Sequence, residues 1–269
     1  MDFNRQVIKE FRANRGRVGG YFEGGRLILL TTTGARSGLP RTTPLAYLPD
    51  GERILVIGSA GGSDKHPDWY HNLLADPVVT VEDGVFAYTA KATVLTGQER
   101  AAVFARAVEA DPGWGAYQAR TSRVLPVVAL EQVAGGPPEA GSAGEVLRVV
   151  HDAFRRELGI IRGEVAAAAP RLGAQLRINC LTFCQGLEFH HRVEDGGMFP
   201  ALGDRHPELD AVFARLRREH ERMAVLLAEL AEAVSGDGED VPARVDGLIA
   251  ELEAHLTYEE EQLIPLLDA

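Results

Sequence analysis

The feature that most limits the fold is a set of polar side chains on the apolar faces of helices in the second half of the chain. Four segments, roughly 143–168, 172–195, 207–235 and 241–266, have the apolar spacing of amphipathic helices. Each places one histidine among its core positions, and the second and fourth add a glutamate four residues later. The predicted core positions are, in order, Leu147, His151, Phe154, Leu158 and Ile161; Leu176, Cys180, Phe183, Leu187, His190 and Glu194; Leu209, Phe213, Leu216, His220, Met223, Leu227, Leu230 and Val234; and Val245, Leu248, Leu252, His255, Glu259 and Leu263.

These polar residues predict a metal site. Residues four apart lie one turn above each other, so His190 with Glu194 and His255 with Glu259 each present an imidazole and a carboxylate to one point. Two unpartnered buried carboxylates would each cost several kcal/mol against a total stability of roughly 5 to 15 kcal/mol. Either a cation offsets their charge, or these glutamates do not lie inside the bundle. These ligand types suit iron, manganese or zinc, and inward Glu and His sets in four-helix bundles are a dinuclear arrangement, so two metals fit better than one.

The chain divides at "AGGPPEAGSAG", residues 134–144, which combines flexible glycines with a Pro-Pro pair and shows no periodicity. We predict a first domain over 1–134, a linker over 135–144 and a second domain over 145–269. Charge supports this division. Residues 1–140 hold 15 basic and 15 acidic residues, whereas the remainder holds 13 and 24 and carries the whole net charge of −11. The two halves therefore differ in charge, as expected of two separate domains.

Short, turn-bounded runs of apolar and β-branched residues fill the first half and predict a small, mostly antiparallel sheet or barrel. Helices are expected at 2–14, 67–75 and 97–110, and Thr96 with Glu99 forms the signature of a capping box before the third. The predicted strands are "RLILLTTT", "RTTPLAYL", "ERILVIGS", "PVVTVE", "FAYTAKATVL" and "LPVVAL". The expected fold class is thus α+β with two domains, the second of them all-α.

The second domain resembles the hemerythrin-like (HHE cation-binding) family over about residues 143–267. The resemblance is carried by "HDAFRREL" at 151, "FHHRVEDGGMFPAL" at 189, "REHERM" at 218 and "HLTYEEEQLIPLL" at 255. It implies a four-helix bundle of hemerythrin type that holds two iron ions. By this resemblance Glu194 and Glu259 are bridging carboxylates, and His151, His190, His220 and His255 are terminal ligands.

One departure from that family bears on function. Oxygen-carrying hemerythrins have a second histidine on the third helix, four residues after the first, where this chain has Ala224. The gap leaves coordination positions for water, His191, Tyr258 or Glu260, although a partly exposed helix position is the simpler expectation for His191. The site should be more open than an oxygen carrier's. We therefore favour reaction with oxygen, peroxide or nitric oxide, or sensing of them, over reversible transport. The other histidines, His66, His71 and His206, fall on no core face and are not expected to bind the metal.

Two glycine-rich turns stand out in the first half. "TTTGARSGLPRTTPL" at 31–45 places Arg36 and Arg41 beside exposed backbone amides, which suits an anion. "GSAGGSDKHPDWYHNL" at 58–73 runs into a helix N-terminus at Pro67, where a phosphate is also favoured. By themselves such turns are most often plain hairpins.

Together the turns resemble those of the deazaflavin-dependent nitroreductase family. The fold of that family is a split β-barrel of the type that binds FMN or F420, and its members bind coenzyme F420. The match covers about residues 17–132 and extends through "ERAAVFARAVEADPGWGAYQARTSRVLPVVAL". It implies that Arg36, Ser37 and Arg41 hold the phosphate and acidic tail of the cofactor. It further implies cofactor contacts from Thr42, Thr43, Ser59, Gly61 and Gly62, and a pocket shaped by Trp69 and Asn72.

The acceptor side of this site is less like the family. Members that reduce nitroimidazoles use several tyrosines, whereas this chain keeps Tyr117 and has Asp111 and Trp114 nearby, with Ala46 after "TTPL". A quinone or another planar acceptor fits better, with Trp114 stacking on it and Tyr117 donating a hydrogen bond. Trp114 is equally compatible with a core position beneath the sheet. The protein orients the cofactor, which performs the hydride transfer itself.

These motifs predict an F420H2-dependent oxidoreductase whose di-iron bundle binds, senses or removes oxygen, peroxide or nitric oxide. Deazaflavins transfer hydrides and iron transfers single electrons, so direct wiring between the domains is not expected. One alternative is a non-catalytic redox sensor that binds flavin or F420 together with two irons. Another makes the bundle the enzyme, with an external electron donor.

Composition sets the remaining expectations. The net charge of −11 argues against a nucleic-acid partner. No apolar run is long enough to span a membrane and the N-terminal sequence lacks the pattern of a secretory signal, so a cytoplasmic location is expected. Cys180 and Cys184 lie one helical turn apart and are expected to be reduced, packing as small hydrophobic groups. Barrels of this type often pair, which leaves a homodimer as an open alternative.

Overall fold

The computed structural model describes residues 3–135, 141–168, 172–236 and 240–269. Contacts divide the chain into two compact units, one of Met1–Glu139 with Gly173–Ile178 and one of Ala140–Leu172 with Asn179–Ala269. The middle of the predicted linker, the break expected at Pro170 and part of the break expected at 235–240 lie outside the described residues.

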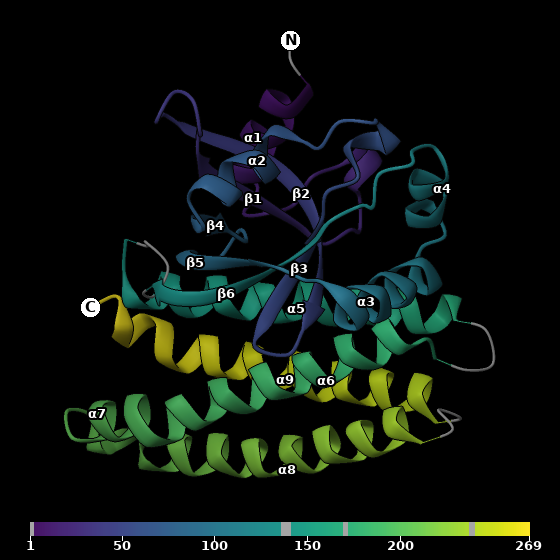
Figure 1. The fold of residues 1–269 in the computed structure, drawn as a ribbon. Coiled ribbons are helices and arrows are strands. Elements are labelled where there is room, and N and C mark those ends of the chain that lie inside the picture. Colours follow the sequence, from purple (N-terminus) through teal and green to yellow (C-terminus); the bar gives the residue numbers. More distant parts are fainter. Residues whose placement is uncertain (1–2, 136–140, 169–171, 237–239) are drawn as a thin grey trace. The chain divides into compact units, whose positions relative to one another are not determined.

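The first unit is built on a closed, fully antiparallel six-stranded barrel, which confirms the predicted fold (Figure 1). Its strands follow each other around the barrel in the order β1-β2-β3-β6-β5-β4, and β1 closes it by pairing with β4. The strands are β1 (Leu27–Thr33), β2 (Pro40–Asp50), β3 (Arg53–Ile57), β4 (Val78–Glu82), β5 (Ala87–Val94) and β6 (Val127–Gly135). Each predicted strand is present.

The apolar run of β1 is continuous because the strand is buried on both faces. Ile28 and Leu30 point into the barrel core, whereas Leu27 and Leu29 pack against Phe11 of the N-terminal helix α1 (Phe3–Ala13). The buried strands therefore read as unbroken apolar runs in the sequence. The hydroxyl-bearing end of β1 carries the chain to the first glycine-rich turn.

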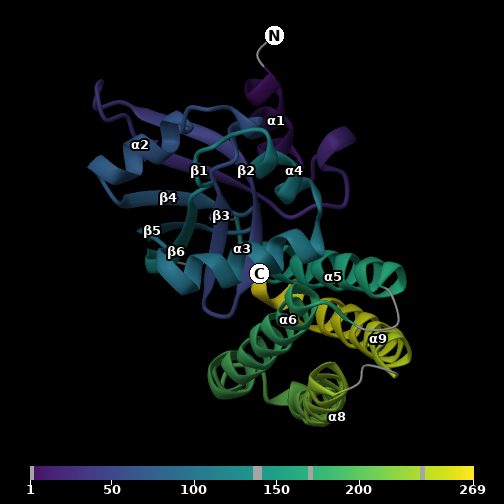
Figure 2. The same ribbon diagram turned by 45° about the vertical axis from the view of Figure 1, so that its right-hand side comes forward.

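Three further helices lie in the first unit: α2 (Asp68–Ala75), α3 (Gly97–Ala110) and α4 (Gly113–Ala119). Figure 2 shows these helices against the barrel strands. The first two match the predicted segments, but α4 is absent from our sequence prediction. Two glycines in a seven-residue segment weaken its intrinsic helix signal, and α4 depends on packing of Trp114 and Tyr117 against the core beside Leu125.

The predicted capping box at the start of α3 does not form. Thr96 lies at the N-cap, but its side chain accepts no helix N–H, and Gly97 that follows has a left-handed φ of 56°. Glu99 instead accepts a 2.8 Å hydrogen bond from Arg53 of β3. A working cap stands at the next helical unit, where the Ser142 hydroxyl accepts from the N–H of Glu145 at 3.1 Å.

The second unit consists mainly of the long helices α5 (Ala143–Ala167), α8 (Asp210–Ser235) and α9 (Val241–Leu267), with the larger part of α6 (Ala174–Val193), whose first residues belong to the first unit. In this unit α9 packs along both α5 and α8 (Figures 1 and 2). Buried predicted core positions are Leu147, His151, Leu158, Ile161, Cys180, Phe183, Leu187, Glu194, Phe213, Leu216, His220, Met223, Leu227, Leu230, Val234, Val245, Leu248, Leu252, His255, Glu259 and Leu263. None of the described helices is both long and apolar enough to cross a membrane.

The sequence predicted a break in the second helix at "DGG", residues 195–197, but the structure shows that the helix continues. Residues Glu194–Met198 form one π-helical turn that leads directly into the short helix α7 (Phe199–Gly203). In this wider turn the Phe199 N–H donates to the carbonyl of Glu194, five residues earlier. Pro200, the next residue, has no N–H group to donate. Such insertions are frequent at functional sites, and this one begins at a predicted metal ligand.

Candidate functional site

The metal-ligand candidates of the four helices meet inside the second unit as two groups. One consists of His151, His190, Glu194 and Glu259, and the other combines His220 and His255 with His191. Within each group the ligand atoms all lie within 4.8 Å of one another. The six side chains that the sequence placed on the core faces are thus all found in these groups.

The two glutamates each lie between imidazoles of different groups. Glu194 places Oε1 3.0 Å from Nε2 of His190 and Oε2 3.6 Å from Nε2 of His220. In Glu259 a single oxygen, Oε2, lies 3.5 Å from Nε2 of both His151 and His255. Each carboxylate therefore faces one imidazole from each group, which is the arrangement that a bridging ligand requires.

A second layer of carboxylates fixes the orientation of three imidazoles. Nδ1 of His151 lies 2.9 Å from Glu260, and Nδ1 of His255 lies 2.9 Å from Glu219. Asp195 lies 3.1 Å from Nδ1 of His220. Because Nδ1 faces a carboxylate, the Nε2 lone pair is directed inward, as in carboxylate–histidine–metal sites.

Most of the inner polar atoms lie close together without forming hydrogen bonds. Across the residues that the structure describes, buried atoms without a hydrogen-bond partner include Nε2 of His151, His190 and His191 and both carboxylate oxygens of Glu194 and Glu259. Unpaired buried groups of this kind are rare and costly in a folded protein. Imidazole nitrogens and carboxylate oxygens that converge without partners fit a bound cation.

Burial perturbs the protonation of this centre. Desolvation lowers the pKa of all five imidazoles, that of His255 to about 4 despite its bond to Glu219. It raises the pKa of Glu194 well above its ordinary value, with the charge of Glu259 as the second cause, and raises the pKa of Glu259 to about 8. The protein alone thus disfavours charge here, and a cation would supply what is missing.

His191 is the residue that sequence reasoning placed wrongly. It was expected to be a partly exposed helix residue, but only 5% of its surface is exposed and its ring stacks on His220 at 4.1 Å between centroids. The pair His191 and Asp195 repeats the i, i+4 spacing of His190 and Glu194, and that doubled signal would have identified it. The other candidates have different roles, since Glu260 contacts His151 and Tyr258 lies under the guanidinium of Arg215.

In the first unit, the turn between β1 and β2 carries the predicted anion-binding residues. Arg36, Ser37 and Arg41 are all exposed. Among the described residues neither arginine has an ion-pair partner, although the chain has a net charge of −11. The turn is tight, because a Cβ on Gly34 would lie 2.6 Å from Oγ of Ser37. Two free guanidiniums on a rigid turn fit an anionic ligand.

Asn72 holds this turn from helix α2. Its Nδ2 donates to Thr32 at 3.0 Å, and its Oδ1 accepts from the N–H of Ala35 at 2.9 Å. Trp69, one turn earlier, is buried in the barrel core. A cavity of ≈ 220 Å³ lies beside the turn, and hydroxyl groups from β1, β4 and β5 are among its lining. The residues lining it are Thr31, Thr32, Thr33, Gly38, Pro40, Val78, Val79, Thr80 and Thr89.

Thr42 and Thr43 continue from the turn into β2. The Thr42 hydroxyl lies 2.8 Å from that of Thr31 across the strand pair, and Thr43 pairs with Leu30. Both threonines are partly buried. They therefore lie close to the arginine turn, on the strand that carries Arg41.

The second glycine-rich turn is organised by Arg123, which was not singled out from the sequence. Its guanidinium donates to the carbonyls of Gly58 at 2.9 Å and Ser59 at 2.5 Å. Gly61 and Gly62 both have left-handed backbone angles. A Cβ on Gly62 would lie 3.0 Å from the Tyr117 carbonyl, so glycine permits the close approach of this turn to α4.

Trp114 and Tyr117 lie together on α4, with their ring centroids 6.2 Å apart. Both are partly buried against the core that surrounds α3. The Tyr117 hydroxyl lies 3.3 Å from that of Tyr21, an exposed residue that the sequence analysis did not select. The structure thus places the predicted acceptor-side residues next to the second glycine-rich turn, with Tyr21 as an additional neighbour.

An antiparallel barrel with arginine- and glycine-rich turns, followed by helices around an imidazole–carboxylate centre, defines a two-part class: an oxidoreductase barrel with a cation-binding helical domain. Residues 3–132 match the model of the F420H(2)-dependent quinone reductase family, and residues 142–267 match the hemerythrin HHE cation binding domain. The chain belongs to the first of these families, and its later part, residues 142–267, is similar to the second.

Two relatives support this assignment. F420H(2)-dependent quinone reductases of Mycobacterium tuberculosis strains H37Rv and CDC 1551 are each 40% identical over 124 residues, covering 45% of this chain and 83% of theirs. A solved structure titled as an F420-H2 dependent reductase is 40% identical, with a TM-score of 0.37, covering 39% of this chain and 94% of its own. The similarity in these comparisons is therefore confined to part of the chain.

Proposed function

We propose that this chain is an F420H2-dependent reductase that passes a hydride to a quinone-like planar acceptor. Its second domain binds two iron ions that react with, or sense, oxygen, peroxide or nitric oxide. The reductase half rests chiefly on family membership together with the unpaired guanidiniums of Arg36 and Arg41. The iron half rests on one observation, the position of Glu194 and Glu259 between two groups of imidazoles.

In the barrel, bound F420 would supply the hydride. Arg36, Ser37 and Arg41 would bind its phosphate and carboxylates, since planar guanidiniums pair with such groups bidentately. Asn72 positions the backbone of that turn rather than the ligand, because both ends of its amide are engaged. Trp69 shapes the site from the core beneath it.

The acceptor would lie near α4. Ser59, Gly61 and Gly62, which would contact the cofactor together with Thr42 and Thr43 of β2, form a turn whose backbone approaches this helix closely. Trp114 offers an aromatic face to a planar ring, and Tyr117 offers a hydroxyl to an acceptor oxygen. These roles are orienting ones.

In the bundle, the first iron would take His151 and His190 and the second His220 and His255, with Glu194 and Glu259 shared. Glu260, Asp195 and Glu219 would hold the imidazoles in the inward orientation. Burial lowers the pKa of these imidazoles and so keeps Nε2 available as a ligand, although the outer carboxylates act on the pKa in the opposite direction.

The reductase proposal is tested by mixing the purified chain with F420H2 and a menadione-type quinone and following reoxidation of the deazaflavin. Turnover should fall at least ten-fold in an Arg36→Ala, Arg41→Ala double variant. Arg12→Ala is the matched control, because Arg12 pairs with Glu82 on the same barrel, 2.6 Å away. Tight F420 binding without hydride transfer to any acceptor would favour a non-catalytic sensor instead.

The iron proposal is tested by metal analysis of the same preparation. Two irons per chain are expected, and Glu259→Ala should lose both, because a bridging carboxylate serves the two ions together. A single iron in the intact chain, or none, would contradict the proposal.

A further inference from the structure

A third imidazole stands beside His220 and His255. His191 is buried, and among the described residues its Nε2 has no hydrogen-bond partner. Its ligand atom lies within 4.8 Å of those of both other histidines. We infer that His191 is the third imidazole ligand of the second cation, and that the pocket beside it is where an added molecule reaches that cation. This inference rests on the proposed two-iron site.

Helix α6 explains how one segment serves both cations. His190 and Glu194 form one column along the helix, and His191 and Asp195 form the adjacent column. The first column faces the group of His151 and Glu259. The second column faces α8, where Asp195 lies 3.1 Å from Nδ1 of His220. One helix therefore contributes an imidazole and a carboxylate to each half of the centre.

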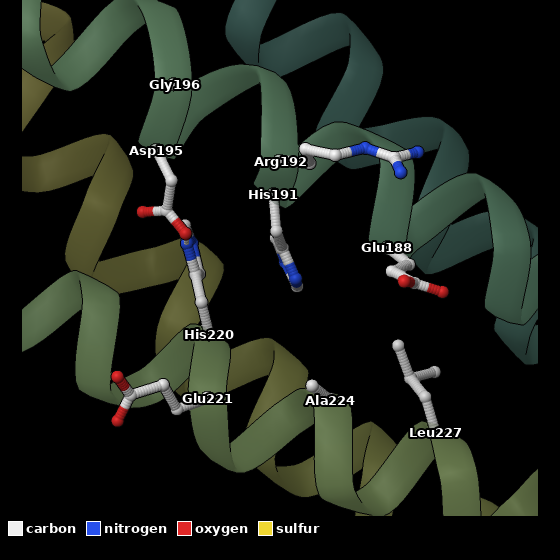
Figure 3. A pocket seen from close by; sticks show the side chains of 9 residues that line it. All are labelled: Glu188, His191, Arg192, Asp195, Gly196, His220, Glu221, Ala224 and Leu227. Atoms are coloured by element: carbon white, nitrogen blue, oxygen red, sulfur yellow. Dashed lines mark ion pairs between the residues drawn. The ribbon is translucent and has the colours of Figure 1, made fainter.

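The surface of α8 makes room for His191. Ala224, one turn after His220, has no group that binds a metal and fills little space. Figure 3 shows His191 pointing from α6 into the gap between the two helices, with Ala224 and Leu227 on the opposite side. An imidazole from α6 thus occupies the space that a second metal-binding side chain on α8 would need.

A pocket of ≈ 480 Å³ lies between α6 and α8, beside the small side chain of Ala224. Its lining is Glu188, His191, Arg192, Asp195, Gly196, His220, Glu221, Ala224 and Leu227. Two of these, His191 and His220, belong to the second group, and no member of the first group lines the pocket. An added molecule would therefore meet the second cation first.

The charge of the pocket selects the kind of molecule. The residues that line it include three acidic side chains, Glu188, Asp195 and Glu221, and one guanidinium, that of Arg192. This excess of negative charge disfavours free anions and favours small neutral molecules. The volume accommodates a ring as large as imidazole, which makes imidazole a suitable probe of access.

The test compares His191→Gly with His151→Gly in the full chain, each loaded with ferrous iron in the presence and absence of imidazole. Iron per chain is measured by elemental analysis, and the state of each iron by Mössbauer spectroscopy. His191→Gly should fall from two irons to about one and should regain the second on addition of imidazole. His151→Gly should also lose iron but should not be rescued, because its cavity does not open to the pocket.

Three results would overturn the inference. One is a His191→Gly protein with two irons and the spectrum of the unsubstituted chain, and another is loss of iron that imidazole does not restore. The third is rescue of both variants alike. Helical circular dichroism of the metal-free proteins shows whether each variant folds, and His191→Gln, which keeps helix propensity, is measured alongside. An unsubstituted chain that binds no iron would instead refute the proposed function, so the two failures are distinguishable.

Discussion

At the scale of the residue, the histidines of the metal centre differ in what stands behind them. His151, His220 and His255 each have a carboxylate at Nδ1, whereas His191 stacks on a neighbouring ring. A carboxylate at Nδ1 raises the basicity of the metal-binding nitrogen and holds the ring in place. The outer carboxylates should therefore contribute to metal affinity without touching the metal.

Glu219→Gln tests this contribution. The amide cannot match the charge that Glu219 presents to Nδ1 of His255 at 2.9 Å, so iron affinity should fall by about 10- to 100-fold. Affinity is measured by competition with a chelator. Glu251→Gln is the matched control, because Glu251 lies on the exposed side and pairs with Arg222. Equal affinities for the two variants would show that Glu219 has no such role.

A buried thiol gives a pH dependence. Burial, with a smaller contribution from Cys180, raises the pKa of Cys184 to about 12. Above pH 9 the unfolded chain loses this proton while the folded chain keeps it, so the thiol's contribution to stability is complete below that pH and is lost as pH rises towards 12. The loss should be about 1.4 kcal/mol per pH unit. Urea unfolding of Cys184→Ala and of the parent is measured between pH 8 and about 11. Above pH 9 the difference between their free energies of unfolding should change by that slope. A difference that stays constant with pH would contradict the prediction.

At the scale of the element, the π-helical turn Glu194–Met198 determines the angle around the helix axis between the ligands of α6 and the core residues of α7. Phe199 and Leu202 are buried beyond the turn, and Phe199 stacks on His220 at 5.6 Å between centroids. An α-helix through the same residues would present a different face at α7. The glycines of the turn matter less for their flexibility than for the extra residue they supply.

Insertion of one more residue beside Gly197 should therefore be far more harmful than substitution of Gly197. The π-helical turn already accommodates one extra residue, and a further one rotates α7 by about 100° and takes Phe199 and Leu202 out of the core. The free energy of unfolding should fall by about 3 kcal/mol or more. Gly197→Ala, by contrast, brings no described atom within 4 Å of the new Cβ and should change stability by less than about 1 kcal/mol. Chemical denaturation measures both, and similar losses would refute the role of the turn.

At the scale of the whole molecule, two units with separate cores carry two kinds of chemistry. The barrel offers arginines and hydroxyl groups to an anionic cofactor, and the bundle offers neutral imidazoles and carboxylates to cations. Each ligand should therefore stabilise its own unit, because binding to the folded state alone raises the stability of the part that binds.

Calorimetry of the full chain tests this independence. Iron should raise the unfolding temperature of one transition and F420 that of the other. At a free concentration 100 times the Kd, each ligand should add about 2.7 kcal/mol to its own unit. Metal removal should reverse the first shift and leave the second unchanged. A single transition that both ligands raise equally would show that the units unfold together.

The sequence alone determined the class of each unit and the core faces of the long helices. Apolar spacing along α8 and α9 and the paired histidine and glutamate positions depend only on helical geometry, which is local. The strands of the barrel were likewise recognisable from short apolar runs between turns. The family resemblances placed the two domains in the right order.

Only the tertiary structure decided which partner each side chain has. It moved Glu99 from a helix cap to Arg53, made α4 a helix through its packing, continued α6 through a π-helical turn and buried His191 against His220. Each depends on groups that are distant along the chain, and local spacing says nothing about the distance between them. The division of the ligands into two groups around Glu194 and Glu259 has the same origin, because it is set by how four helices pack.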